Sequence, residues 1–158
     1  MHRILACSAA LVCVATIAGC GLDSASSLQG ATYTATLTGR GEVPPVSTPA
    51  SGSATFILTG RTVAYTVSAS GLATTLTVGH VHLGGTGVVS VVIVPFAIAA
   101  QSGVVASGTI DLSTPVTFGN VTIPGDSLRT LFEKGQAYVN LHTAAYPGGE
   151  IRGQVVRQ

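Results

Sequence analysis

The chain has 158 residues, a length that suits one domain and leaves no room for a second domain with its own core. Only 8% of the residues are charged and the formal net charge is +1, so no basic stripe offers the surface that nucleic-acid binding requires. The 20 glycines and the abundant Val, Thr and Ser residues favour short strands and tight turns over long helices.

The N-terminus has the pattern of a secretory signal peptide. Arg3 supplies a positive charge, residues 4–17 are apolar apart from small polar residues, and Ile17-Ala18-Gly19-Cys20 resembles a lipobox. We therefore predict a signal peptide over residues 1–19, followed by a diacylglycerol-carrying Cys20 that anchors the protein to a membrane. The alternative is a plain signal peptide followed by a chance cysteine.

The residues after Cys20 predict where the protein is held. Residues 20–30 are rich in Ser and Gly, which predicts a lipidated cysteine on a flexible tether and leaves residues 31–158 as the folded domain. By resemblance to the bacterial lipoprotein sorting rule, Gly21, in place of Asp after the cysteine, favours the outer membrane or the cell surface. Both other cysteines, Cys7 and Cys13, fall in the predicted signal peptide, so the domain has no disulfide.

Alternating apolar and polar residues predict a succession of short strands in the rest of the chain. The predicted strands cover residues 33–38, 54–58, 63–69, 76–83, 88–94, 106–112, 137–142 and 150–156. Gly60-Arg61 predicts a hairpin turn, and Asp126 is predicted to cap a helix over residues 127–134 that stops at Gly135. The pattern predicts an all-β fold, a sandwich or barrel of about eight strands with one short helix.

The polar residues of the domain gather on a few predicted strand faces. His80 and His82 share one face of their strand because side chains two residues apart point the same way. Two later strands present further sets on one face each: Tyr138, Asn140 and His142, and then Glu150, Arg152 and Gln154. All the histidines that follow the predicted signal peptide therefore fall in these segments.

Three interpretations of this cluster remain open. His80, His82 and His142, with Glu42 or Glu150 as a carboxylate ligand, would suit copper or zinc. In a structural network, the histidines would instead hydrogen-bond to Glu150, Asn140 or loop carbonyls, and Arg152 would form an ion pair with Glu42 or Glu150. Metal-based catalysis is the third interpretation, and it is disfavoured because no nucleophile motif is present.

Five separated motifs resemble those of the CHRD domain, which is named after chordin and also occurs in bacterial secreted proteins. They are Glu42-Val43-Pro44-Pro45-Val46, Gly71-Leu72, His80-Val81-His82-Leu83-Gly84 with Gly87, Tyr138-Val139-Asn140-Leu141-His142-Thr143, and Pro147-Gly148-Gly149-Glu150-Ile151-Arg152-Gly153-Gln154. The resemblance runs from about Tyr33 to Val156. It implies an immunoglobulin-like β-sandwich or barrel akin to copper/zinc superoxide dismutase.

The resemblance also bears on activity. The segment His80-Val81-His82 is similar to the copper-binding strand pair of those dismutases, but a dismutase needs further histidines, a zinc-site aspartate and usually a disulfide, and this chain lacks the set. We therefore expect no enzymatic activity. The expected function is an exported, lipid-anchored binding or structural module with an unknown protein or envelope partner, and the alternative is a copper- or zinc-binding envelope protein.

Overall fold

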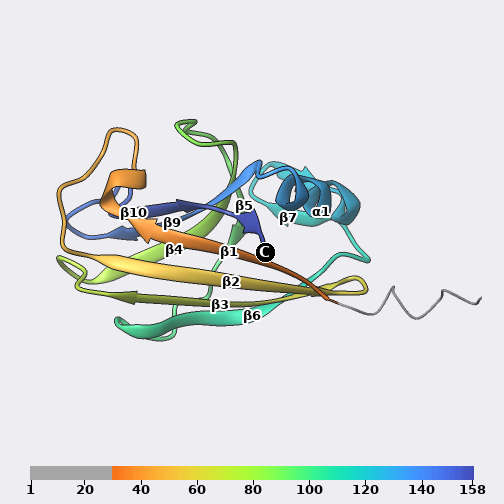
Figure 1. The fold of residues 1–158 in the computed structure, drawn as a ribbon, viewed down its shortest axis with the longest axis horizontal. Helices are drawn as coiled ribbons and strands as arrows, with labels where there is room; N and C mark the ends of the chain where they lie inside the picture. The colour runs from red at the N-terminus through yellow and green to blue at the C-terminus, as the bar shows by residue number, and fades with distance from the viewer. Residues whose placement is uncertain (1–29) are drawn as a thin grey trace, which may run out of the picture.

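The computed structural model describes residues 30–158 (Figure 1). The predicted signal peptide, Cys20 and all but the last residue of the predicted tether lie outside the described residues. No helix in the described part of the chain is long and apolar enough to cross a membrane. The elements, in chain order, are β1 (Ala31–Thr38), the 3-10 helix η2 (Gly39–Gly41), β2 (Ser51–Thr59), β3 (Thr62–Ser70), β4 (Leu76–Leu83), β5 (Val92–Pro95), β6 (Gly103–Asp111), β7 (Val116–Phe118), β8 (Val121–Ile123), α1 (Gly125–Glu133), β9 (Ala137–Thr143), β10 (Ile151–Gln154) and β11 (Val156–Arg157).

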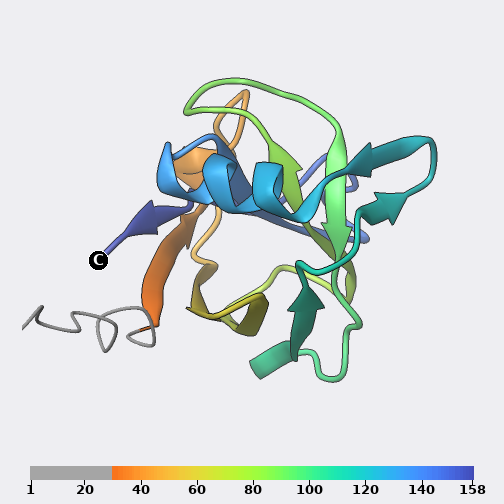
Figure 2. The same cartoon turned by 90° about the vertical axis from the view of Figure 1, so that its right-hand side faces the viewer.

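Most of the strands form one antiparallel sheet in the order β5-β4-β9-β10-β1-β2-β3-β6, and β11 pairs with β1. The sheet curls into a half-barrel, as the end-on view shows (Figure 2). The strands β7 and β8 form a separate two-stranded sheet. The predicted all-β class with one short helix is therefore confirmed.

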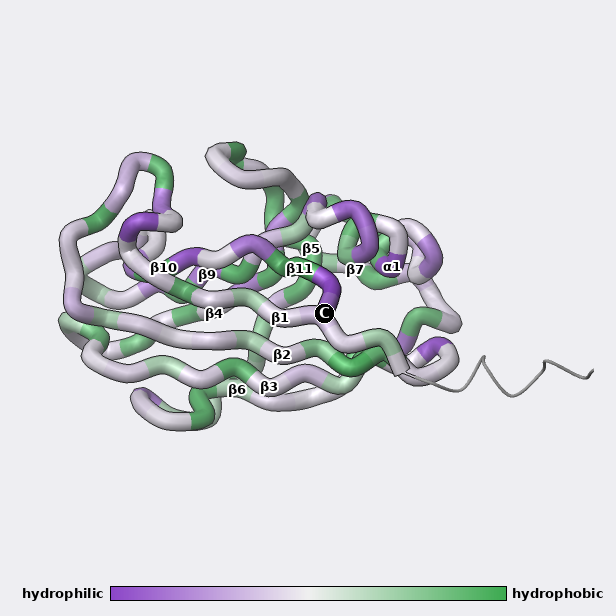
Figure 3. Tube along the Cα trace, viewed as in Figure 1, coloured by the Kyte–Doolittle hydropathy of each residue, from purple (hydrophilic) through white to green (hydrophobic). Residues whose placement is uncertain are grey.

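Alternation along each strand creates the core. Inward side chains such as Leu37, Phe56 and Val67 are completely buried, and the Thr and Ser residues between them point away from the interior. Gly60 and Arg61 form the two-residue turn between β2 and β3, and Gly60 has a φ of 59°, which suits a tight hairpin. In the hydropathy view, β1 to β3 are mostly pale, and strongly hydrophilic residues gather near η2, β11 and α1 (Figure 3).

The helix α1 closes one end of the half-barrel. Its Phe132 ring lies 5.6 Å from the ring of Tyr33 and 5.0 Å from that of Phe56, both measured between centroids. The predicted cap is wrong, because the helix begins at Gly125 and Asp126 lies in the first turn without a capping bond. The predicted stop is confirmed: Gly135 has a φ of 60° and follows the last turn.

Several strand boundaries differ from the predictions. The strand expected at residues 88–94 begins only at Val92, because Val92 is the residue that pairs with His82 and residues 84–91 loop out between them. The last predicted strand is split at Val155 into β10 and β11, and the strand expected at 106–112 begins at Gly103. The β7–β8 hairpin was missed, although its Gly119-Asn120 turn between alternating residues is a recognisable signal.

Two loops rise from the same side of the sheet (Figure 1). One follows β1 and contains the Pro-rich segment 43–46, and the other joins β4 to β5 through residues 84–91. Both meet the outward face of β4, β9 and β10. This face is therefore covered, and all seven residues of β9 are buried although they alternate between the two faces.

Candidate metal centre

The neighbouring strands β4 and β9 bring the three histidines of the domain together. In this antiparallel pair Val78 lies opposite His142, and His80 lies opposite Asn140. The imidazole centroid of His80 is 5.5 Å from that of His82 and 5.2 Å from that of His142, and the His82 and His142 centroids are 6.2 Å apart. Sequence alone left open whether His142 approaches the other two, and the structure shows that it does.

Loop carbonyls fix the tautomer of two of these imidazoles. Nδ1 of His82 lies 2.9 Å from the carbonyl oxygen of Ser90, and Nδ1 of His142 lies 2.9 Å from that of Pro147. A carbonyl oxygen can only accept, so Nδ1–H donates in both cases and the lone pair lies on Nε2. Both Nε2 atoms are buried and have no hydrogen-bond partner.

The third imidazole is also left with a buried nitrogen. Nδ1 of His80 has no hydrogen-bond partner. Burial, together with the adjacent His142 and His82, lowers the pKa of His80 from 6.5 to about 4, and burial is the largest of these causes. Burial also lowers the pKa of His82, although the hydrogen bond to Ser90 opposes that shift. His80 and His82 are therefore neutral at pH 7, the state in which imidazole binds a metal.

The cluster fits a transition-metal ion. One nitrogen from each of His80, His82 and His142 lies within 4.8 Å of the other two. Ligands at a Zn–N distance of about 2.0–2.1 Å lie roughly 3.4 Å apart around a tetrahedral ion, so the imidazoles would move closer together when an ion binds. Three imidazoles without a thiolate suit zinc or copper. No carboxylate belongs to this group among the residues that the structure describes.

Aromatic and backbone contacts hold the cluster in place. The ring of Tyr138 stacks on that of His82 at 4.8 Å between centroids, with an angle of 8° between the planes. The Tyr138 hydroxyl accepts a hydrogen bond from the backbone N–H of Ser90, the residue whose carbonyl orients His82. The guanidinium carbon of Arg152 lies 3.4 Å above the Tyr138 ring, a cation–π contact.

The predicted ion pair of Arg152 is wrong. Its guanidinium donates to the carbonyl oxygens of Val88, at 2.8 Å, and Gly85, at 3.2 Å, and it pairs with neither Glu42 nor Glu150. The cause is the register, in which Arg152 lies opposite Asn140 and extends over Tyr138 toward the 84–91 loop. Arg152 therefore fastens that loop to the sheet.

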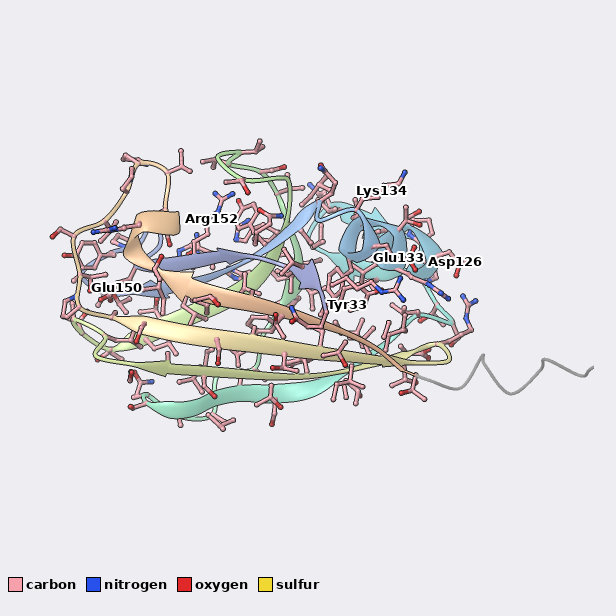
Figure 4. All side chains as sticks on the ribbon, in the orientation of Figure 1. Tyr33, Asp126, Glu133, Lys134, Glu150 and Arg152 are labelled. Atoms are coloured by element: carbon pink, nitrogen blue, oxygen red, sulfur yellow. The ribbon has the colours of Figure 1, made fainter. Side chains whose placement is uncertain are left out.

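Glu150 lies apart from Arg152, toward the left end of the sheet in Figure 4. Its fully buried carboxylate accepts hydrogen bonds from the hydroxyls of Thr48 and Thr143, each at 2.7 Å, and from the backbone N–H of Ala73 at 2.9 Å. These donors satisfy the carboxylate, so Glu150 is a structural anchor of two loops. It is not one of the grouped potential metal ligands.

Glu42 and Asn140 form a second buried polar pair beside the cluster. They are 6% and 5% exposed, and the amide of Asn140 donates to Oε2 of Glu42 at 3.4 Å. Burial raises the pKa of Glu42 to about 7, although Arg152 and the Asn140 hydrogen bond both oppose this shift. Oε1 of Glu42 and Oδ1 of Asn140 have no hydrogen-bond partner. Glu42 also lines a cavity that sequence reasoning did not anticipate.

The structure bears on two of the three interpretations. Loop carbonyls do bind His82 and His142, as a structural network requires, whereas Glu150 and Asn140 form no hydrogen bond with an imidazole. The network leaves one buried nitrogen of each imidazole unsatisfied, and the three histidines form a group with the dimensions of a metal site.

A comparison with known protein families finds one match, and it spans the site. Residues 33–155 match the CHRD domain, which covers every site residue discussed above except those of the N-terminal segment. The searches of curated proteins and of solved structures find no match.

Proposed function

This chain belongs to the CHRD domain family, and we propose that it is an exported, lipid-anchored envelope protein that binds zinc or copper through His80, His82 and His142. Family membership favours a binding or structural module. The proposal makes the metal ion the ligand of that module and assigns the protein no enzymatic activity. The lipobox-like segment that ends at Cys20 supports the anchor, and its partner is then the membrane.

One observation carries the metal proposal: each of three adjacent imidazoles has a buried nitrogen without a hydrogen-bond partner, and the same three residues can each offer a ring nitrogen within 4.8 Å of the other two. A buried polar atom without a partner costs roughly 1–3 kcal/mol, and native proteins contain few of them. Three such atoms in three adjacent imidazoles would be an expensive way to build a purely structural network. A bound metal ion would satisfy all three at once.

The chain's own residues prepare the site for that ion. The carbonyls of Ser90 and Pro147 orient two imidazoles through Nδ1–H, which leaves Nε2 of each ring as the nitrogen that can bind a metal. Burial lowers the pKa of His80 and of His82, which favours the neutral form that binds a metal. When bound, the metal would supply a Lewis-acidic crosslink between β4 and β9.

The test is elemental analysis of residues 21–158, which include every described element, purified without a histidine tag and incubated with zinc or copper(II). We expect close to one metal ion per chain. The double variant His80→Ala/His82→Ala should bind none while its far-UV circular dichroism stays that of a β protein. Asn140→Ala is the matched control, because it removes a buried polar side chain from the same face without removing an imidazole.

The proposal fails if the wild-type chain takes up neither ion, or if the double variant retains the wild-type stoichiometry. Uptake that is lost equally in Asn140→Ala would assign the effect to the fold of this face and would also contradict the imidazole assignment. Export and anchoring are tested separately by the Cys20 variant described below.

A further inference from the structure

The strand β6 borders the large sheet and has a neighbouring strand on one side only. It pairs with β3, and no other strand in the described part of the chain pairs with it. Its ribbon forms the lower border of the sheet in Figure 1. In its second half, Ser107, Gly108, Thr109 and Asp111 are all exposed. This stretch of β6 therefore has an open edge on the side away from β3.

The hydrogen bonds between β3 and β6 show which main-chain groups point outward from this edge. The N–H of Leu112 donates to the carbonyl oxygen of Arg61, on the β3 side, at 2.7 Å. Successive residues of a paired strand alternate between facing the partner strand and facing away from it. The N–H and C=O groups of Ser107, Thr109 and Asp111 therefore point away from β3. Among the described residues, none of these main-chain groups has a hydrogen-bond partner.

The usual protection of an edge strand is missing here. Native proteins protect such edges with proline, charged side chains, bulges, a short length or a covering segment. The opposite border, β5, has four residues and ends at Pro95, whereas β6 has nine residues, no proline and one charged residue, Asp111. A covering segment reaches only the first half of β6, where the N–H of Ala99 donates to the carbonyl oxygen of Val105. Residues 107–111 are left open, and we call this stretch the β6 edge.

We propose that two copies of this chain pair through their β6 edges, antiparallel and with the two-fold axis at Thr109, so that the two sheets become one. The inference is independent of the metal site and of the lipid anchor, because it uses no histidine and no part of the N-terminal segment.

The main chain of the β6 edge selects an extended strand as its partner. A row of alternating N–H and C=O groups is satisfied in full by the matching row of another strand. With the axis at Thr109, this residue lies opposite itself, and Ser107 lies opposite Asp111 of the second copy. Every outward group then has a partner. A shift of this register places the groups at one end of the edge opposite residues beyond the open stretch.

The side chains favour a second copy as the source of that strand. In the proposed register the two Thr109 side chains are direct cross-strand neighbours, a favourable pair in antiparallel sheets. The hydroxyl of Ser107 lies opposite the carboxylate of Asp111, so a donor meets an acceptor. The two Asp111 carboxylates do not face each other, which avoids the like-charge repulsion that a different self-pairing would create. The edge is therefore self-complementary, as an interface between two identical chains requires.

The first experiment is sedimentation velocity of residues 21–158, which contain the whole buried core, over a range of concentrations and with a chelator. We expect a concentration-dependent dimer. Thr109→Pro removes an outward N–H from each copy and should weaken the dimer at least about 10-fold. The variant should still fold, because an edge strand tolerates proline where its N–H faces solvent. Thr66→Val, which changes the exposed side chain opposite Ser107 on β3, should leave the dimer unchanged.

The second experiment is cross-linking, which tests the register and does not depend on the folding of the proline variant. Residues 21–158 contain no cysteine, so single cysteines can be introduced. Across the proposed axis, the Cα atoms of the two Thr109→Cys residues lie about 5.5 Å apart, and a short bis-maleimide should join them. Two Thr66→Cys residues would lie about 20 Å apart and should not be joined.

Three results would each overturn the proposal. They are a monomer at every concentration, a dimer that persists unchanged in a folded Thr109→Pro protein, and cross-linking at Thr66→Cys that equals or exceeds cross-linking at Thr109→Cys. The last two results would place the contact between the copies on another surface. Metal uptake by the Thr109→Pro protein, measured beside the wild type, separates a failure of this proposal from a failure of the metal site.

Discussion

Replacing Glu42 with Gln should change how the stability of the domain depends on pH. Burial raises the pKa of this carboxyl from 4.5 to about 7 in the folded protein. A group whose pKa is raised by folding holds its proton more tightly when folded, so its favourable contribution is present at low pH and is lost as the pH rises through 7. For these two pKa values, the loss between pH 5 and pH 8.5 is about 2.5 kcal/mol of unfolding free energy.

The assay is urea-induced unfolding at pH 5 and pH 8.5, with a chelator, of the wild type and of Glu42→Gln. The glutamine keeps the shape of the side chain and cannot ionise, so the variant should gain about 2.5 kcal/mol relative to the wild type over this pH interval. The histidines titrate in both proteins, and their contribution cancels in the comparison. Stability differences that are the same at both pH values would refute the argument, because they would show that Glu42 ionises in the fold as it does in water.

Three further predictions concern the metal, the loop and the anchor. Zinc at a free concentration 100 times its dissociation constant should stabilise the wild type by about 2.7 kcal/mol in thermal unfolding and should leave His80→Ala/His82→Ala unchanged; stabilisation of both proteins would point to binding elsewhere. Gly149→Ala should lose about 2–3 kcal/mol in urea unfolding, because the new Cβ meets Glu42 and Asn140 at a φ of 127°, whereas Gly87→Ala, with a φ of 78° in open space, should lose only about 1 kcal/mol; equal losses would contradict the close contact. Cys20→Ser should move the protein from the membrane fraction to the soluble fraction after cell lysis, and an unchanged distribution would argue against the lipid anchor.

Strand periodicity predicted which face each site residue occupies. His80 and His82 point away from the core because Val81, between them, is fully buried, and the same alternation directs Asn140 and His142 away from the buried Val139 and Leu141. This inference needs only the period of two residues in a strand. The face that a side chain occupies depends only on its own strand, so it can be predicted from the sequence.

The order of strands in the sheet depends on contacts between distant parts of the chain, and this order decides which site residues become neighbours. The pairing of β4 with β9 joins segments about 60 residues apart, and nothing in either strand's alternation states that they are neighbours. The same limit explains the error at Arg152. Its face was predicted, but its partners are backbone carbonyls of the 84–91 loop, and a loop's path over a sheet leaves no periodic signal in the sequence.

Glu150 shows a third limit. It precedes β10 rather than lying within it, so the strand alternation that governs Arg152 and Gln154 does not fix its direction. The carboxylate turns to Thr48, Ala73 and Thr143 instead. Residues at strand ends follow the hydrogen-bond donors of the nearby loops, and those become known only when the chain is folded.

The buried side-chain atoms that lack a hydrogen-bond partner are concentrated on one face of the described domain. Among the described residues, six buried side-chain atoms lack a hydrogen-bond partner, and only the Tyr33 hydroxyl lies away from the outward face of β4 and β9 or its covering loops. The other five are Glu42 Oε1, His80 Nδ1, His82 Nε2, Asn140 Oδ1 and His142 Nε2. They divide by chemistry as well as by place, since the three nitrogens suit a metal ion and the two oxygens require a hydrogen-bond donor. Errors in packing would scatter such atoms through the core, whereas this domain gathers them on one face beneath two loops.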